Sequence, residues 1–230
     1  MQTFFDRLLH ENKNIFLMII IGAVILSGCG KLPLVSTFLG APPQATQSSQ
    51  LLFDDFSETK SGWDRFAGEI GTTDYKNKAY QISINEPNTD LFANPYKLFK
   101  DTIIEVKAAR IGGPVNNSFG VICRFQDEKN FYSAQISSDG YAGIFRMKDG
   151  VYKLLGQDAM IAVPSILGGS AMNTIHFECI GRSLALAVNG APVDAREDKS
   201  FENGDVGLIA GAFEEAGVVI AFDDLSVTLP

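Results

Sequence analysis

The chain has 230 residues, of which 46% are hydrophobic and 20% charged, a composition typical of a globular protein with a sizeable core. Its net charge is −8 at pH 7 and it has no basic cluster, which excludes nucleic acid as a partner bound through its phosphates. The three cysteines and two histidines lack the spacing of a structural zinc site.

The N-terminal part of the chain contains a continuous apolar run at residues 15–26. As a helix it would be about 18 Å long, shorter than the roughly 30 Å hydrocarbon core of a bilayer, so it fits the core of a signal peptide better than a membrane span. The run ends in Leu26-Ser27-Gly28-Cys29, which resembles the lipobox of bacterial lipoprotein precursors. The resemblance implies that residues 1–28 are removed and that the Cys29 thiol is lipidated. The alternative is an uncleaved anchor with an incidental cysteine.

Residues 29–50 form the predicted lipidated cysteine and a flexible linker. Pro33, Pro42 and Pro43 interrupt regular structure, and the last ten residues, APPQATQSSQ, are small and uncharged. We expect the linker to hold the following domain near the lipid bilayer. The bilayer is therefore a predicted partner, bound through the acylated Cys29. The predicted location is the extracytoplasmic face of the cell envelope.

From residue 51 to residue 230 the sequence predicts strands and tight turns. Apolar and polar side chains alternate with period two over residues 101–111, 118–126 and 174–181, as in half-buried strands. Asp-Gly or Asn-Gly pairs at 139–140, 149–150 and 189–190 tolerate the positive φ angles of hairpin turns. They predict a meander over 130–156 and two further hairpins over 173–196. The expected fold class is all-β, a sandwich or a barrel.

Several segments of this domain look like a bacterial domain of the laminin-G/concanavalin-A-like superfamily. They include LLFDDFSETKSGWDRF, FGVICRFQDEKNFYSAQISSDGY and VVIAFDDLSV. The sequence is similar to the group labelled domain of unknown function 1080, also called 3-keto-disaccharide hydrolase. The resemblance covers most of residues 51–230. It implies a jelly-roll sandwich of two antiparallel sheets with one concave face, in a superfamily that includes lectins, glycosidases and domains without activity.

Binding of carbohydrate on the concave sheet is the predicted function. Sugars are bound by flat aromatic rings and by amide, guanidinium and carboxylate groups. Four residues alternate away from the expected core positions and would form one patch if their strands are neighbours: Arg124, Gln126, Phe131 and Gln135. The alternative for Arg124 is an ion pair with Asp127 or Glu178 that stabilises the sheet.

Catalysis has no support from motifs. The Glu-x-Asp-x-x-Glu pattern of catalytic superfamily members is absent, and His176 is accompanied by no Gly-x-Ser-x-Gly. His176 is expected on the solvent face of a strand, Trp63 in the core, and residues 127–130 in a polar hairpin. The alternative for Trp63 is stacking on a sugar. The alternatives to a binding module are a 3-keto-glycoside hydrolase or lyase and a structural envelope domain with no small ligand.

Two further features concern stability. Cys123 and Cys179 lie on the apolar sides of their strands, so after export they either form a disulfide or remain two buried thiols. In the resembling fold the strands at the two ends of the domain run close together, which would gather Asp54, Asp55, Asp223 and Asp224. Carboxylates are calcium ligands, so a structural calcium ion is the one cofactor considered. The alternative is two pairs of acids that are solvated or cap turns.

Overall fold

The computed structural model describes residues 50–230. The predicted signal peptide at 1–28, the predicted lipidation site Cys29 and the predicted linker up to residue 49 lie outside the described residues. Within residues 50–230 the chain forms strands joined by turns and loops. No helix in this part of the chain is long and apolar enough to cross a membrane.

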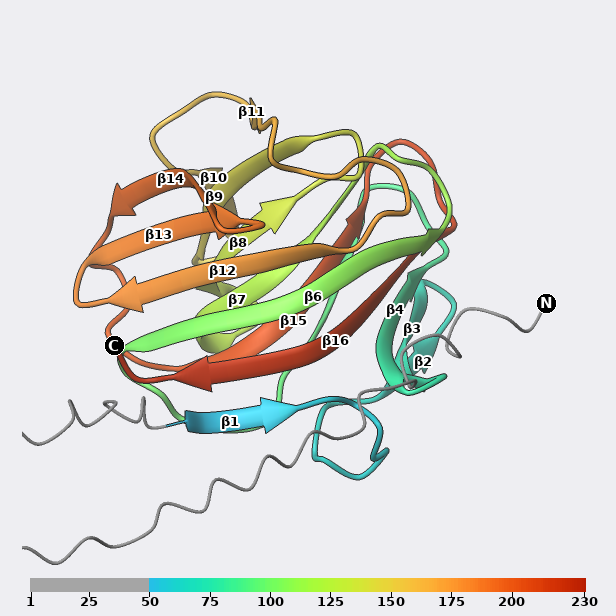
Figure 1. Cartoon of the computed structure of the whole chain (residues 1–230), viewed down its shortest axis with the longest axis horizontal. Coiled ribbons are helices and arrows are strands. Elements are labelled where there is room, and N and C mark those ends of the chain that lie inside the picture. The colour runs from blue at the N-terminus through green and yellow to red at the C-terminus, as the bar shows by residue number, and fades with distance from the viewer. Residues whose placement is uncertain (1–49) are drawn as a thin grey trace, which may run out of the picture. The chain divides into compact units, whose positions relative to one another are not determined.

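The strands form two antiparallel sheets, which lie one behind the other in Figure 1. Sheet A has the order β14-β13-β12-β6-β16-β4-β3-β2, and β1 also pairs with β16. Its strands are β1 (Gln50–Asp54), β2 (Phe66–Gly68), β3 (Gly71–Lys76), β4 (Ala79–Ile84), β6 (Thr102–Gly112), β12 (Asn173–Ile180), β13 (Ser183–Val188), β14 (Ala191–Glu197) and β16 (Val218–Thr228).

Sheet B has the order β10-β9-β8-β7-β15-β5, and the short β11 pairs with β9. Its strands are β5 (Thr89–Ala93), β7 (Asn117–Asp127), β8 (Asn130–Ile136), β9 (Tyr141–Lys148), β10 (Val151–Leu154), β11 (Ile161–Ala162) and β15 (Asp205–Ala212). Neighbours such as β7 and β15 are far apart in sequence, so the sheets are assembled through long connections. This is the two-sheet antiparallel sandwich that the sequence predicts.

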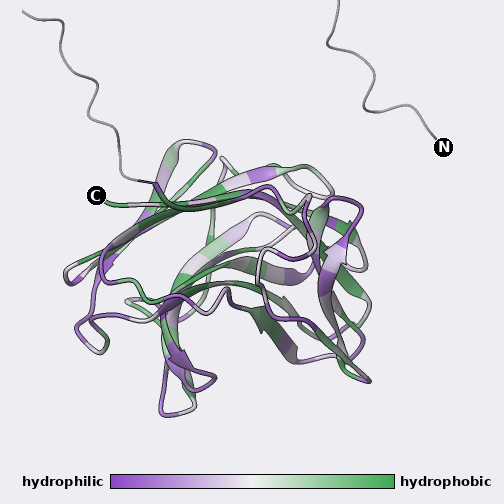
Figure 2. Ribbon diagram, turned by 90° about the horizontal axis from the view of Figure 1, so that it is seen from below, coloured by the Kyte–Doolittle hydropathy of each residue, from purple (hydrophilic) through white to green (hydrophobic). Residues whose placement is uncertain are grey.

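The hydrophobic core lies between the two sheets. In β6, Ile104, Val106 and Ala108 are fully buried, as the alternation of this segment predicts. Ile175 and Phe177 of β12 are buried in the same way. Along the strands hydrophobic and hydrophilic stretches alternate, and several of the connecting loops are mainly hydrophilic (Figure 2). The period-two pattern is therefore confirmed in these strands.

The predicted turns are also confirmed. Asp149 and Asn189 have φ angles of 51° and 52°, and the glycine after each has a φ of 78°. These pairs form the tight connections from β9 to β10 and from β13 to β14. Two-residue turns of this kind match the twist of the strands they join. They set the hairpins β9-β10 and β13-β14. The Asp139-Gly140 pair lies in the connection from β8 to β9, where Gly140 has a φ of 98°.

Candidate functional site

The face of sheet B turned away from the core is called its outer face, and two glycines flank Gln135 at its centre. Gly120 of β7 lies opposite Gln135 of β8, which lies opposite Gly143 of β9. Directly opposed residues on neighbouring strands point to the same face of a sheet. Gln135 therefore lies between two glycines, and the Leu154 side chain packs over Gly143.

Gln135 belongs to a hydrogen-bonded group. Its Nε2 donates to Ser133 Oγ at 2.9 Å and to the Tyr152 hydroxyl, and the Ser133 and Tyr152 hydroxyl oxygens are 3.3 Å apart. The Tyr152 ring stacks on Phe145, with ring centroids 5.0 Å apart and planes 1° from parallel. Gln135 is 2% exposed and Tyr152 is 37% exposed. Gln135 and Ser133 thus position Tyr152, which is open to solvent.

Asp90 of β5 and Ser118 of β7 converge over Gly211 of β15. Gly211 lies opposite both residues in the sheet. A Cβ atom on Gly211 would collide with Asp90 Oδ1 and lie 2.5 Å from Ser118 Oγ, so a side chain at this position would displace both polar groups. Asp90 is exposed, and it brings a carboxylate to the same face as Tyr152.

The pKa values of Asp90 and Tyr152 on this face are raised because neighbouring atoms exclude water from their polar groups. Desolvation raises the pKa of Asp90 to about 6. Desolvation and, after it, the charge of Asp90 raise the pKa of Tyr152. At neutral pH Tyr152 is therefore a protonated hydroxyl that can donate and accept, and Asp90 is largely a carboxylate that accepts. We call the following five residues the outer-face patch: Asp90, Ser118, Ser133, Gln135 and Tyr152.

Apolar side chains flank the patch on the same face. Ile122, Phe131 and Ile209 form a buried cluster that is separate from the core between the sheets. The partly buried Phe92 and Phe125 pack against it, with ring centroids 5.3 Å apart. Polar groups beside aromatic rings on one face of a sheet are typical of a site for a hydroxylated ligand.

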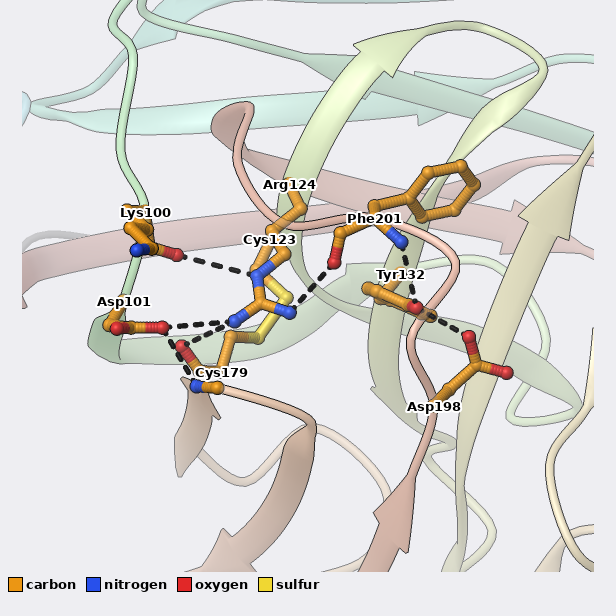
Figure 3. The surroundings of a disulfide bond; sticks show 9 residues. Lys100, Asp101, Cys123, Arg124, Tyr132, Cys179, Asp198 and Phe201 are labelled. Atoms are coloured by element: carbon orange, nitrogen blue, oxygen red, sulfur yellow. Dashed lines mark hydrogen bonds and ion pairs between the residues drawn. A yellow bond between two sulfur atoms is a disulfide. The ribbon is translucent and has the colours of Figure 1, made fainter.

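The prediction that Arg124 contacts a ligand is wrong. The β7–β8 register shifts between Cys123 and Asp127, which marks a β-bulge, and Arg124 has a φ of 52° there. The Arg124 side chain is only 2% exposed and lies between the sheets. Its guanidinium donates at 2.9–3.3 Å to the backbone carbonyls of Lys100, Phe201 and Cys179 and to the Asp101 carboxylate (Figure 3). Arg124 is therefore a structural group; its ion pair is with Asp101, not with either acid predicted as its alternative partner.

The bulge also changes which side chains reach the outer face. Phe125, which alternation from Cys123 would place on the core side, packs against Phe131 in the outer cluster, with ring centroids 5.8 Å apart. Gln126 is exposed after the bulge and does not belong to the patch. Phe131 and Gln135 do share the outer face, but each is only 2% exposed. They form its floor and do not offer an open binding surface.

Sequence reasoning missed the two patch residues that are open to solvent. Tyr152 could have been found, because the Asp149-Gly150 turn pairs Tyr152 with Met147 and so places it on the face of Phe131. No local sequence pattern indicates the position of Asp90. Its position depends on the pairing of β5 with β15, which are more than a hundred residues apart in the chain.

Cys123 and Cys179 form a disulfide with their Cα atoms 6.7 Å apart (Figure 3). Cys123 belongs to β7 of sheet B and Cys179 to β12 of sheet A, so the bond joins the two layers. Arg124 bonds to the Cys179 carbonyl directly beside it. Disulfides persist in oxidising compartments, so this bond indicates an extracytoplasmic protein.

The strands that carry the four predicted calcium ligands are neighbours as expected, because β1 pairs with β16 and Asp54 lies opposite Leu225. The four residues are Asp54, Asp55, Asp223 and Asp224, and each is engaged locally. Asp54 is buried and accepts a hydrogen bond from Trp63 Nε1 at 2.9 Å. Asp55 caps the turn that follows it, and Asp224 pairs with Lys107 Nζ at 2.6 Å. Within residues 50–230, no group of three or more His, Cys, Asp or Glu side chains is arranged to hold a metal ion. These acids act as local caps and ion-pair partners.

Three other residues or segments lie where the sequence places them. Trp63 is 4% exposed and packs against Phe56 in the core. His176 lies on the solvent side of β12, 3.1 Å from Glu178 Oε1. Asp127 caps its own hairpin by accepting the Lys129 backbone N–H at 2.8 Å. None of the three contributes to the outer-face patch.

Comparisons with known proteins support the fold. No family model matches the chain. No curated protein matches it either. Among solved structures, the carbohydrate-binding module CBM66 from Bacillus subtilis superposes with a TM-score of 0.59 at 18% identity, covering 73% of this chain and 95% of that one. A Bacillus licheniformis β-glucanase superposes with a TM-score of 0.56 at 11% identity, covering 78% and 97%.

A Bacillus subtilis protein of unknown function with a galectin-like fold gives a TM-score of 0.58 at 11% identity, covering 78% of this chain and 95% of that one. At these identities the similarity shows the fold alone. The domain is a concanavalin-A-like jelly-roll sandwich, a fold that supports both binding and hydrolysis of sugars in other proteins.

Proposed function

We propose that this chain is a lipid-anchored extracytoplasmic protein whose β-sandwich binds carbohydrate, without catalysis, on the outer face of sheet B. The observation that carries the proposal is the outer-face patch, in which Tyr152 is fixed by Gln135 and faces the same side as the Asp90 carboxylate. The match in fold to a carbohydrate-binding module supports the same function.

The patch has the groups that sugar hydroxyls need. The Asp90 carboxylate accepts hydrogen bonds from neighbouring hydroxyls, and the Tyr152 hydroxyl both donates and accepts. The stacked Phe145 and Tyr152 rings form an amphipathic wall beside them, on which the apolar face of a sugar ring can pack. Because Gln135 and Ser133 already hold Tyr152, little side-chain entropy is lost on binding.

The binding test compares two patch variants with a distant control on a glycan array and then by calorimetry. We expect Tyr152→Ala and Asp90→Asn each to weaken binding about tenfold or more, since each removes a group that hydrogen-bonds to the ligand at the centre of the contact. Phe53→Ala is the control, because Phe53 is 54% exposed on β1 of sheet A. Binding that survives both patch variants, or no binding to any glycan, would contradict the proposal.

A glycoside hydrolase or lyase is the second candidate, favoured by the fold match to a β-glucanase. Glycoside hydrolysis usually requires two facing carboxylates. In the described structure Asp90 is not the one carboxylate on this face, because Asp205 of β15 lies opposite the outward-facing Phe125 of β7. Product release in the binding assay, lost in Asp90→Asn, would favour the enzyme over the binding module. A structural envelope domain predicts neither binding nor product.

The lipid anchor rests on the lipobox-like ending of the apolar run. Covalent acyl chains add roughly 0.8 kcal/mol of membrane affinity per buried methylene, so two or three chains on Cys29 would hold the protein firmly. We expect wild-type protein to partition into detergent and Cys29→Ala to accumulate as an unprocessed precursor. Partition of the mature wild-type protein into water would overturn the anchor and leave the binding function standing.

A further inference from the structure

A hollow of about 450 Å³ lies at one end of the outer face, where β5 ends and the β7–β8 hairpin begins. It is lined by Asp64, Phe92, Asn94, Tyr96, Phe125 and residues 127–129. Phe92 belongs both to this hollow and to the apolar cluster that flanks the outer-face patch. The hollow is therefore continuous with the patch but has its own set of polar groups.

Asn94 provides a buried acceptor with no partner. It is 2% exposed, and its Nδ2 donates to the Val206 carbonyl at 2.6 Å. That bond fixes the orientation of the amide, because a flipped amide would place two oxygens against each other. Asn94 Oδ1 then has no hydrogen-bond partner among the described residues. A buried acceptor without a donor costs free energy, so the site favours a ligand that supplies one.

The other polar groups of the hollow are mostly acceptors too. Asp64, Asp127 and Glu128 contribute three carboxylates, against one cation, Lys129. Asp64 accepts the Tyr96 hydroxyl, and Asp127 caps its own hairpin. Glu128 is exposed. The hollow is thus negative, rich in acceptors and poor in donors.

An ammonium group matches this set of groups better than a neutral hydroxyl does. It carries three donors, no acceptor and a positive charge. The Phe92 and Phe125 rings, whose centroids are 5.3 Å apart, line the same hollow and attract cations through their π faces.

The hollow and the outer-face patch lie in line along one strand. Asp90, Phe92 and Asn94 are alternate positions at β5, and alternate residues of a strand point to the same face. A Cβ atom on the outward-facing Gly207 would lie 2.6 Å from Asn94 Nδ2, which places Asn94 on the outer face. Asp90 and Asn94 are separated by roughly 13 Å of strand. One oligosaccharide can therefore contact both sites.

We infer that the hollow binds the ammonium group of a de-N-acetylated amino sugar in the glycan held by the outer-face patch. The inference rests on the proposed carbohydrate binding and names the class of sugar. Asn94 Oδ1 and the Asp64 and Glu128 carboxylates accept from the ammonium, and Phe92 and Phe125 pack against it.

The test uses the full chain in detergent and two probes, a tetrasaccharide of glucosamine and its fully N-acetylated counterpart. We expect the glucosamine form to bind at least tenfold more tightly. Glu128→Gln should weaken binding of the glucosamine form roughly threefold, the effect of one partly exposed charge pair, and leave the N-acetylated form unchanged. Glu128 makes no side-chain hydrogen bond in the described structure, so this variant keeps the fold. Asp64→Asn should act in the same direction.

Glu197→Gln is the matched control, since Glu197 is an exposed acid on β14 of sheet A. Equal affinity for the two probes, or the same loss in Glu128→Gln and Glu197→Gln, would overturn the inference. Neutral glycans that bind through Tyr152 while neither probe binds would overturn it too, with the proposed function intact. Failure of every glycan to bind would overturn both.

Discussion

Reduction of the Cys123–Cys179 disulfide tests how strongly the two sheets depend on their covalent link. The cysteines are 56 residues apart in sequence and belong to different sheets. Loop-closure entropy for a loop of this size predicts that the bond stabilises the folded state by about 4 kcal/mol. A domain of this length loses roughly 2–4 °C of melting temperature per kcal/mol, so reduction should lower Tm by about 8–16 °C.

The assay is thermal unfolding followed by circular dichroism, with and without a thiol reductant. Reduction keeps the sulfur atoms in the core, so it isolates the effect of the cross-link from the effect of lost packing. The Cys123→Ala/Cys179→Ala double variant is the control and should not respond to reductant. A Tm shift below about 2 °C in a fully reduced wild-type sample would refute the argument that the cross-link restrains the unfolded chain.

Three further predictions concern single side chains. Arg124→Leu should lower the free energy of unfolding by about 3–5 kcal/mol in urea titrations, because it leaves several buried acceptors unpaired. Burial alone would raise the pKa of Asp198, but hydrogen bonds from Tyr132 and Ser200 and the Arg146 charge hold it at about 2, below the usual 3.8. The stability that Asp198 contributes is present above pH 4 and lost as pH falls towards 2, so Asp198→Asn should flatten the acid limb of a Tm–pH curve. Desolvation raises the pKa of Asp90 from 3.8 to about 6, so its ionisation destabilises the fold as pH rises from 4 to 6. Asp90→Asn should therefore raise Tm at pH 7 but not at pH 4, and an equal effect at both would refute this assignment.

The sheets could be predicted from sequence because local patterns determine most of their strands. The buried positions of β12 follow a strict alternation that ends at Cys179, and the hairpin after β13 follows from Asn189-Gly190. The order of strands within a sheet has no such local signal. The pairing of β7 with β15 and of β15 with β5 depends on long-range contacts, and these pairings place Asp90 in the candidate site.

The four residues predicted to bind sugar show where period-two reasoning fails. Counting outward positions from Cys123 is correct up to the bulge, where the β7–β8 register shifts and Phe125 turns to the outer face. Beyond the hairpin, Phe131 and Gln135 keep the face that the alternation predicts. Arg124 adopts a positive φ at that point, and no glycine, asparagine or aspartate marks it in the sequence. The buried oxygens that hold the guanidinium come from residues 100–101, 179 and 201, which no pattern around Arg124 could reveal. The same network explains why the strain is tolerated, because four hydrogen bonds to one buried cation offset an unfavourable backbone conformation. The bulge carries Phe125 to the outer face, where its ring lines the hollow that we assign to an ammonium group.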